Sequence, residues 1–145
     1  MRFLGHPVHP MLVHFPIVLW TIAVIAYVAN AAGMIEAADE IAEYSNGAGL
    51  IMALLAMTAG GFELRTIDSR SEAMRVATSH MMFMAVVWFC FLAALLLQVS
   101  PGRSASPLVV ASCAIAGFLL MIAGARLGGR LVYDFGVAVK SQSKP

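Results

Sequence analysis

Residues 76–99 read VATSHMMFMAVVWFCFLAALLLQV, and this stretch decides the fold class. It holds no Asp, Glu, Lys or Arg along its whole length. A helix needs about 20 apolar residues to cross the hydrocarbon core of a bilayer, which is about 30 Å thick. Lipid offers no hydrogen bonds to an exposed backbone, so a single spanning segment of this kind must be helical. The stretch therefore predicts a transmembrane helix.

Three further apolar runs of similar length accompany it, at about residues 11–32, 46–64 and 107–127. The chain has 145 residues, of which 61% are hydrophobic and only 12% are charged. A soluble domain of this size needs more polar surface than that composition supplies. The sequence therefore predicts an all-α fold, in which residues 1–145 form one integral membrane domain, a bundle of four transmembrane helices.

The basic residues predict how the bundle lies in the membrane. With four spans, both termini and the connection between the second and third spans lie on one side. Loops rich in Lys and Arg stay in the cytoplasm. Arg103 is the one basic residue of the opposite side. The other eight are Arg2, Arg65, Arg70, Arg75, Arg126, Arg130, Lys140 and Lys144. We therefore expect a multi-pass protein of the inner (cell) membrane with both termini in the cytoplasm.

The connections between the spans are short. Residues 34–47, MIEAADEIAEYSNG, predict a brief amphipathic helix before the second span, with Ser45 or Asn46 as the N-cap of the second helix. Pro107 is expected at the first position of the fourth helix. The basic residues flank membrane helices, so lipid headgroups account for them, and nucleic acid is not an expected partner.

Histidines mark the candidate site. Three of the four lie in GHPVHPMLVHFP, residues 5–16. His6 and His9 precede the first predicted span, and His14 lies about one turn inside it. His80 lies at the mouth of the third span, on the same side of the membrane. Ionisable residues in a membrane bundle are costly and usually face its interior. We therefore expect the site on this side.

An imidazole at position 14 has three interpretations. It can donate a hydrogen bond to a backbone carbonyl near the kink that Pro16 should cause. It can act with His80, from a second helix at similar depth, as an axial ligand of haem iron. It can also join a zinc or copper site with His6 and His9, completed by His80 or Glu63.

If a haem is bound, basic side chains on the same side of the membrane could bind its propionate groups. A guanidinium group binds carboxylates such as haem propionates well. The candidate cofactor-binding residues are Arg126, Arg130, Arg75 and Tyr133.

The two ends of the chain resemble a known family. The start GHPVHPMLVHFPIVLW (residues 5–20) and the end GARLGGRLVYDFGVAV (residues 124–139) resemble a family of bacterial four-helix membrane proteins, domain of unknown function 2231. The resemblance points to His6, Pro7, His9, Pro10, His14, Pro16, His80, Gly128, Gly129, Leu131, Val132, Tyr133 and Gly136. Relatives joined to Rieske-type or cytochrome-type domains imply redox work in a bacterial membrane.

These observations predict a b-type haem held by His14 and His80, in a small subunit or partner of a redox complex that passes electrons. His6 and His9 would tune or cover the haem, and a separate partner protein would exchange electrons with it. The alternatives are a histidine-based zinc or copper protein and a structural accessory subunit without cofactor, which could form a homo-oligomer. No phosphate loop or nucleophile motif is present, so an electron-transfer or accessory protein is expected rather than a stand-alone enzyme.

Overall fold

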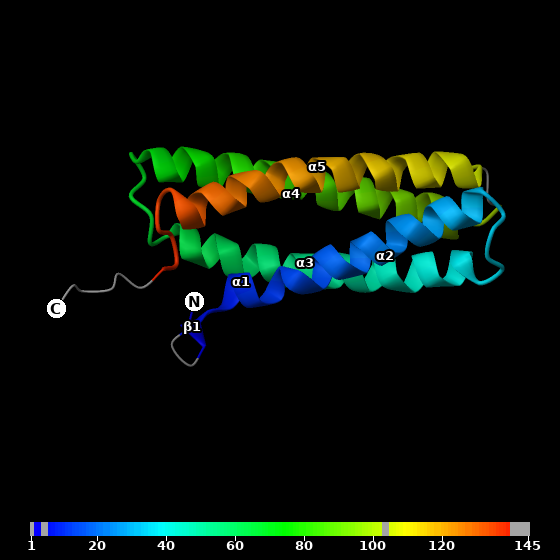
Figure 1. The fold of residues 1–145 in the computed structure, drawn as a ribbon, viewed down its shortest axis with the longest axis horizontal. Helices are drawn as coiled ribbons and strands as arrows, with labels where there is room; N and C mark the ends of the chain where they lie inside the picture. The colour runs from blue at the N-terminus through cyan, green and yellow to red at the C-terminus, as the bar shows by residue number, and fades with distance from the viewer. Residues whose placement is uncertain (1, 4–5, 103–104, 140–145) are drawn as a thin grey trace.

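The computed structural model describes residues 2–3, 6–102 and 105–139. Its long helices lie side by side in one elongated bundle (Figure 1). Two helices in line, α1 (Val8–Leu12) and α2 (His14–Ala31), make the first span, and the other spans are α3 (Ala38–Leu64), α4 (Glu72–Val99) and α5 (Pro107–Tyr133). Ahead of α1, the strands β1 (Arg2–Phe3) and β2 (His6–Pro7) pair antiparallel, with Phe3 opposite His6.

The two ends of the bundle differ in what they carry. The start of α1, the end of α5 and the α3–α4 connection lie at one end, which we call the terminal end (Figure 1). The α2–α3 and α4–α5 connections lie at the opposite end, which we call the far end. Connections lie at alternate ends of the bundle because each of the four spans crosses its whole length and the connections between them are short.

The prediction of an all-α membrane bundle is confirmed. Within the described residues, four helical segments are long and apolar enough to cross a membrane. Only 22–33% of the most apolar part of each segment is buried inside the bundle. The other apolar side chains lie on the outer surface, where water would disfavour them and lipid does not.

The helices pack as two hairpins, α2 against α3 and α4 against α5, and α1 continues along α3 (Figure 1). Many of the buried residues are alanines, which let helix backbones approach closely in lipid. A large aromatic contact joins the two hairpins: Trp20 of α2 stacks on Phe91 of α4, with ring centroids 4.4 Å apart and planes 2° apart. Buried alanines in this core include Ala23, Ala26, Ala42, Ala53, Ala94, Ala111 and Ala114.

The first span is interrupted where a kink is expected. Pro16 has no N–H to bond the carbonyl of Leu12, and its ring crowds that carbonyl. Accordingly, α1 ends at Leu12 and α2 begins at His14. The Val13 N–H still donates to the His9 carbonyl at 3.1 Å, and the Ile17 N–H donates to the Val13 carbonyl at 3.3 Å. The interruption is therefore a local distortion within one span.

The prediction of a separate helix before the second span is wrong. One continuous helix, α3, begins at Ala38 and runs through Ser45 and Asn46, so neither residue is an N-cap. Asp39 and Glu40 lie in its first turn, where negative charge is favourable at a helix N-terminus. The helix therefore starts in the acidic segment and not at the edge of the apolar run.

Two other helices also extend beyond their apolar runs. Ser71 caps α4, because its Oγ accepts a hydrogen bond from the Met74 N–H at 3.1 Å. At the same end of the bundle, α5 continues to Tyr133 and so includes Gly128. Pro107 is the first residue of α5, as predicted.

Candidate functional site

Two imidazoles meet at the terminal end of the bundle. His9 lies on α1 and His80 lies on α4, and their ring centroids are 6.5 Å apart with planes inclined at 80°. These helices belong to different hairpins. The imidazole pair therefore bridges the two halves of the bundle.

Each ring is fixed within its own half by a hydrogen bond to the backbone. His9 Nδ1 lies 2.7 Å from the Ala56 carbonyl oxygen on α3, and His80 Nδ1 lies 2.9 Å from the Gly124 carbonyl oxygen on α5. A carbonyl oxygen can only accept, so Nδ1 carries the proton in both rings, and in the neutral form Nε2 keeps a lone pair. Metal-binding histidines are commonly oriented in this way.

Two glycines let the rings lie against the helix backbones. A Cβ atom at Gly60 of α3 would stand 3.0 Å from His9 Nδ1, and a Cβ atom at Gly128 of α5 would stand 3.1 Å from His80 Cε1. Both distances are shorter than ordinary van der Waals contact. Gly128 belongs to the conspicuous closing segment of the sequence, so part of that segment serves to seat the His80 ring.

The other two histidines stand apart from the described pair. The His14 side chain is exposed on the outside of the bundle, and no described residue forms a hydrogen bond with its ring. Position 14 is five steps along the chain from position 9, which on a helix turns the two side chains about 140° apart. The structure therefore brings His80 together with His9 and not with His14. His6 is in β2, and its side chain lies outside the described part of the chain.

Predicted cofactor-binding residues lie at the terminal end but on its surface. Arg75, Arg126, Arg130 and Tyr133 are all exposed. Arg130 joins the end of α5 to the start of α4, because its Nη2 lies 3.7 Å from Glu72 Oε1 and its Nε donates to Asp134 Oδ2 at 3.2 Å. Exposed ion pairs of this kind stabilise a protein by at most about 1 kcal/mol.

Glu63 is an alternative ligand in the predicted zinc or copper site. It follows Ala56 and Gly60 at helical spacing on α3, so it shares the face that meets His9. Its Oε1 is buried and has no hydrogen-bond partner in the described structure. However, no group of three or more His, Cys, Asp or Glu among the described residues could hold a metal ion. A third protein ligand beside the imidazole pair is thus missing from this part of the chain.

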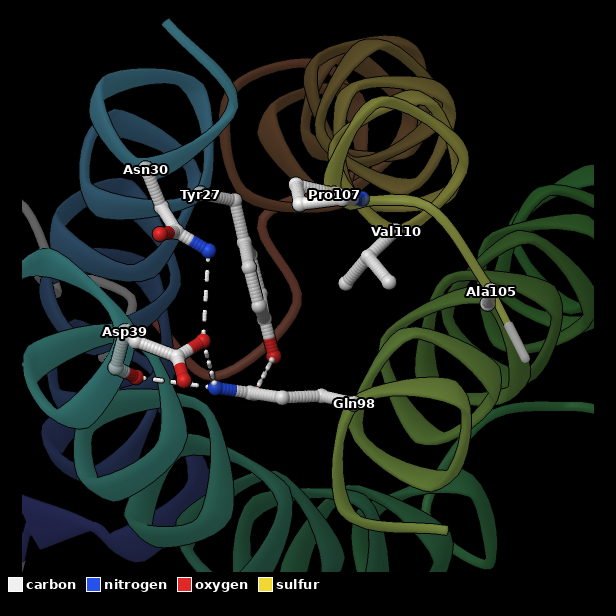
Figure 2. A pocket seen from close by; sticks show the side chains of 7 residues that line it. All are labelled: Tyr27, Asn30, Asp39, Gln98, Ala105, Pro107 and Val110. Carbon is white, nitrogen blue, oxygen red and sulfur yellow. Dashed lines mark hydrogen bonds between the residues drawn. The ribbon is translucent and has the colours of Figure 1, made fainter. Parts of the chain in front are cut away.

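A second polar cluster occupies the far end (Figure 2). The Tyr27 hydroxyl donates to Gln98 Oε1 at 2.8 Å, and Gln98 Nε2 donates to the carbonyl oxygen and to Oδ1 of Asp39, at 2.8 and 2.9 Å. Asn30 Nδ2 also donates to Asp39 Oδ1, at 3.2 Å. These side chains border a cavity of about 10 Å³, which has room for about one water molecule.

Asn46 extends this cluster into the middle of the bundle. Its side chain is fully buried, and Nδ2 donates to the Tyr27 hydroxyl at 3.0 Å and to the Phe91 carbonyl at 2.9 Å. The far-end network therefore ties α2, α3 and α4 together. This network is not among the features predicted from the sequence, although a signal was available: Asn46 and Gln98 are amides placed among apolar residues of membrane spans.

Comparison with known proteins identifies the family only. No curated protein and no solved structure matches the chain. The family model for predicted membrane proteins of domain of unknown function 2231 (DUF2231) matches residues 5–141. That match covers nearly the whole chain, including both members of the imidazole pair and the closing segment. The chain therefore belongs to the DUF2231 family of predicted membrane proteins.

Proposed function

We propose that the protein is a membrane-embedded redox subunit that holds one b-type haem through His9 and His80 and passes electrons to a partner protein or larger membrane complex. A bound haem supplies one-electron chemistry, and the protein supplies its ligands and surroundings. The observation that carries the proposal is the imidazole pair, in which both Nδ1 atoms bond to carbonyls and both Nε2 atoms keep a lone pair.

The spacing of the two rings supports this role. An imidazole nitrogen binds a metal at about 2.0–2.1 Å. Two imidazoles on opposite sides of one metal therefore have ring centres about 6 Å apart, and the observed separation is 6.5 Å. The ligands come from α1 and α4, so the haem would also connect the two hairpins.

The number of ligands favours haem over a bare ion. A zinc or copper site needs three or four ligands from the protein, whereas the porphyrin itself supplies four nitrogens and leaves two axial positions. The described residues offer two imidazoles and no third ligand beside them. This number of ligands suits haem better than a bare ion.

The remaining residues of the terminal end have supporting roles in the proposal. Hydrogen bonds from Nδ1 to Ala56 and Gly124 keep each imidazole in one orientation. In the proposal, the exposed Arg75 and Arg126 bind carboxylate groups of a cofactor, and Arg130 does so in exchange for its ion pairs with Glu72 and Asp134. The exposed Tyr133 is the last residue of α5, the helix that carries Arg126 and Arg130. Basic residues concentrate at this end, so we place it at the cytoplasmic face of a bacterial inner membrane.

A second candidate function is a structural accessory subunit without cofactor. The far-end network supports it, because Tyr27, Asn46 and Gln98 join the hairpins by direct hydrogen bonds. Such a bundle needs no metal to be complete, and it could dock to a larger membrane partner or to a second copy of itself.

Visible spectra of the purified full-length protein separate these functions. We expect a Soret band and, on reduction, an α band. His9→Ala and His80→Ala should each abolish or strongly shift these bands, since either change removes an axial ligand. His14→Ala is the matched control and should leave the spectrum unchanged, because the His14 side chain is exposed.

Three outcomes would contradict the haem proposal. Loss of the bands in His14→Ala with retention in His9→Ala would show that His14, and not His9, binds the haem iron. A colourless protein with stoichiometric zinc or copper would favour the ion site, and a colourless, metal-free protein would favour the accessory subunit. Circular dichroism of each variant shows whether the helices are intact.

A further inference from the structure

A groove between α3 and α4 opens on the side of the bundle toward the far end. Its volume is about 430 Å³. We propose that this groove binds a phospholipid with a primary-ammonium headgroup, one acyl chain lying in the groove and the ammonium group at Glu43. The lining residues are Glu43, Tyr44, Gly47, Ala48 and Ile51 of α3 and Leu95 and Val99 of α4.

The groove arises from small residues between larger ones. A Cβ atom at Gly47 would meet nothing within 4 Å, and the neighbouring Ala48 is exposed. Ile51 is 63% exposed and, with Leu95, borders the hollow. The helices α3 and α4 belong to different hairpins, and their connection lies at the terminal end (Figure 1). No loop therefore covers the outer side of this helix pair near the far end, and the hollow lies on the lipid-facing surface, outside the hydrogen bonds by which Asp39 and Asn46 join α3 to α4.

The size of the groove selects an acyl chain over a helix. From Glu43 to Ile51 the helix rises about 12 Å. A partner helix about 10 Å across would occupy about 900 Å³ over that length, roughly twice the volume of the groove. The observed volume lies in the range of small-ligand sites, about 300–1,000 Å³. An extended hydrocarbon chain can lie within it, whereas a partner helix would insert only the side chains of one face, so the volume favours the acyl chain.

Charge at the mouth of the groove selects the headgroup. Glu43 is exposed, and Tyr44, 75% exposed, lies beside it, as tyrosines do at a membrane–water boundary. Exposed Glu36 and Glu40 lie at the same end of the bundle. An acidic rim attracts an ammonium group and repels a headgroup of net negative charge. The chemistry therefore fits phosphatidylethanolamine better than phosphatidylglycerol.

Native mass spectrometry of the full-length protein in detergent tests the proposal. Phosphatidylethanolamine and phosphatidylglycerol with identical acyl chains are added in turn. We expect about one phosphatidylethanolamine per chain, bound about threefold to fivefold better than phosphatidylglycerol. Glu43→Gln should bring this ratio close to one, because it removes the charge and keeps the shape.

A matched pair of glycine variants tests the groove itself. Gly47→Leu should fill the groove and reduce bound phosphatidylethanolamine at least about fivefold. Gly61→Leu is the control, since a Cβ atom at Gly61 also meets nothing within 4 Å and Gly61 does not line the groove. Circular dichroism and gel filtration check that both variants fold.

Three results would overturn the proposal. The first is equal binding of the two lipids to the unmodified protein. The second is equal lipid binding by the Gly47→Leu and Gly61→Leu variants. The third is a dimer that Gly47→Leu dissociates, which would assign the groove to a second copy of the chain.

Discussion

Replacing Asn46 by alanine is expected to lower the free energy of unfolding by about 2–3 kcal/mol. The substitution removes two hydrogen bonds, to the Tyr27 hydroxyl and the Phe91 carbonyl, which join α3 to α2 and α4. Hydrogen bonds between membrane helices contribute about 0.6 kcal/mol each on average. The cavity left by a fully buried side chain adds the rest. Reversible unfolding in mixed detergent micelles, followed by circular dichroism, measures the loss.

Ser45→Ala is the matched control for this prediction. Ser45 precedes Asn46 on α3, but its hydroxyl bonds only to carbonyls of its own helix, those of Ile41 at 2.5 Å and Ala42 at 3.3 Å. Its replacement should change the free energy of unfolding by less than about 0.5 kcal/mol. Equal losses in the two variants would show that the far-end network does not hold the helices together.

Gly49→Ala is expected to destabilise the protein by about 2 kcal/mol, although the change adds one methyl group. A Cβ atom at this position would stand 2.7 Å from Cδ1 and Nε1 of Trp20. The Trp20 ring is only 3% exposed and is stacked on Phe91, so it has no free space to move into. The same detergent unfolding measurement applies, and tryptophan fluorescence should also shift because the ring is displaced.

Gly47→Ala provides the comparison on the same helix. Nothing lies within 4 Å of a Cβ atom at Gly47, and alanine in a helix is favoured over glycine by about 0.5–1 kcal/mol. This variant should be as stable as the unmodified protein or slightly more stable. If Gly49→Ala were equally harmless, Trp20 would not pack against α3 as the structure has it.

The four spans could be predicted from the sequence because apolar length is a direct physical requirement of the bilayer. Residues 76–99 and 107–127 fall inside α4 and α5, and Pro107 begins α5 as expected. The helix ends could not be predicted in the same way. Backbone hydrogen bonding continues into polar segments, so α3 starts at Ala38 and α5 reaches Tyr133, beyond the apolar runs that mark the spans.

The gathering of histidines at one end of the bundle could be predicted from the sequence, but which two of them form a pair could not. Topology places His9 and His80 at the terminal end together with His14. Which imidazole faces the bundle interior depends on the helical phase around Val13 and on how α1 packs against α3. Neither can be predicted from the local sequence. The depth of His14 suggested a buried ligand, yet its helical position points the side chain outward.

Asn46 illustrates a second kind of ambiguity. An asparagine between an acidic segment and an apolar run is typical of a helix N-cap. The same residue also suits a buried amide that joins helices in lipid. Only the packing of Tyr27 and Phe91 around it decides between the two, so local sequence could not separate a cap from a core network.

Cysteine crosslinking across the terminal end tests most directly whether His9 and His80 face each other between the two hairpins. Cys90 and Cys113, both free thiols, are first replaced by serine. The pairs His9→Cys/His80→Cys and His14→Cys/His80→Cys are then treated with a short bifunctional thiol reagent in native membranes, and the α3–α4 connection is cut at an introduced protease site. We predict joined fragments for the 9/80 pair and separate fragments for the 14/80 pair. Joined fragments for 14/80 with separate fragments for 9/80 would contradict the account.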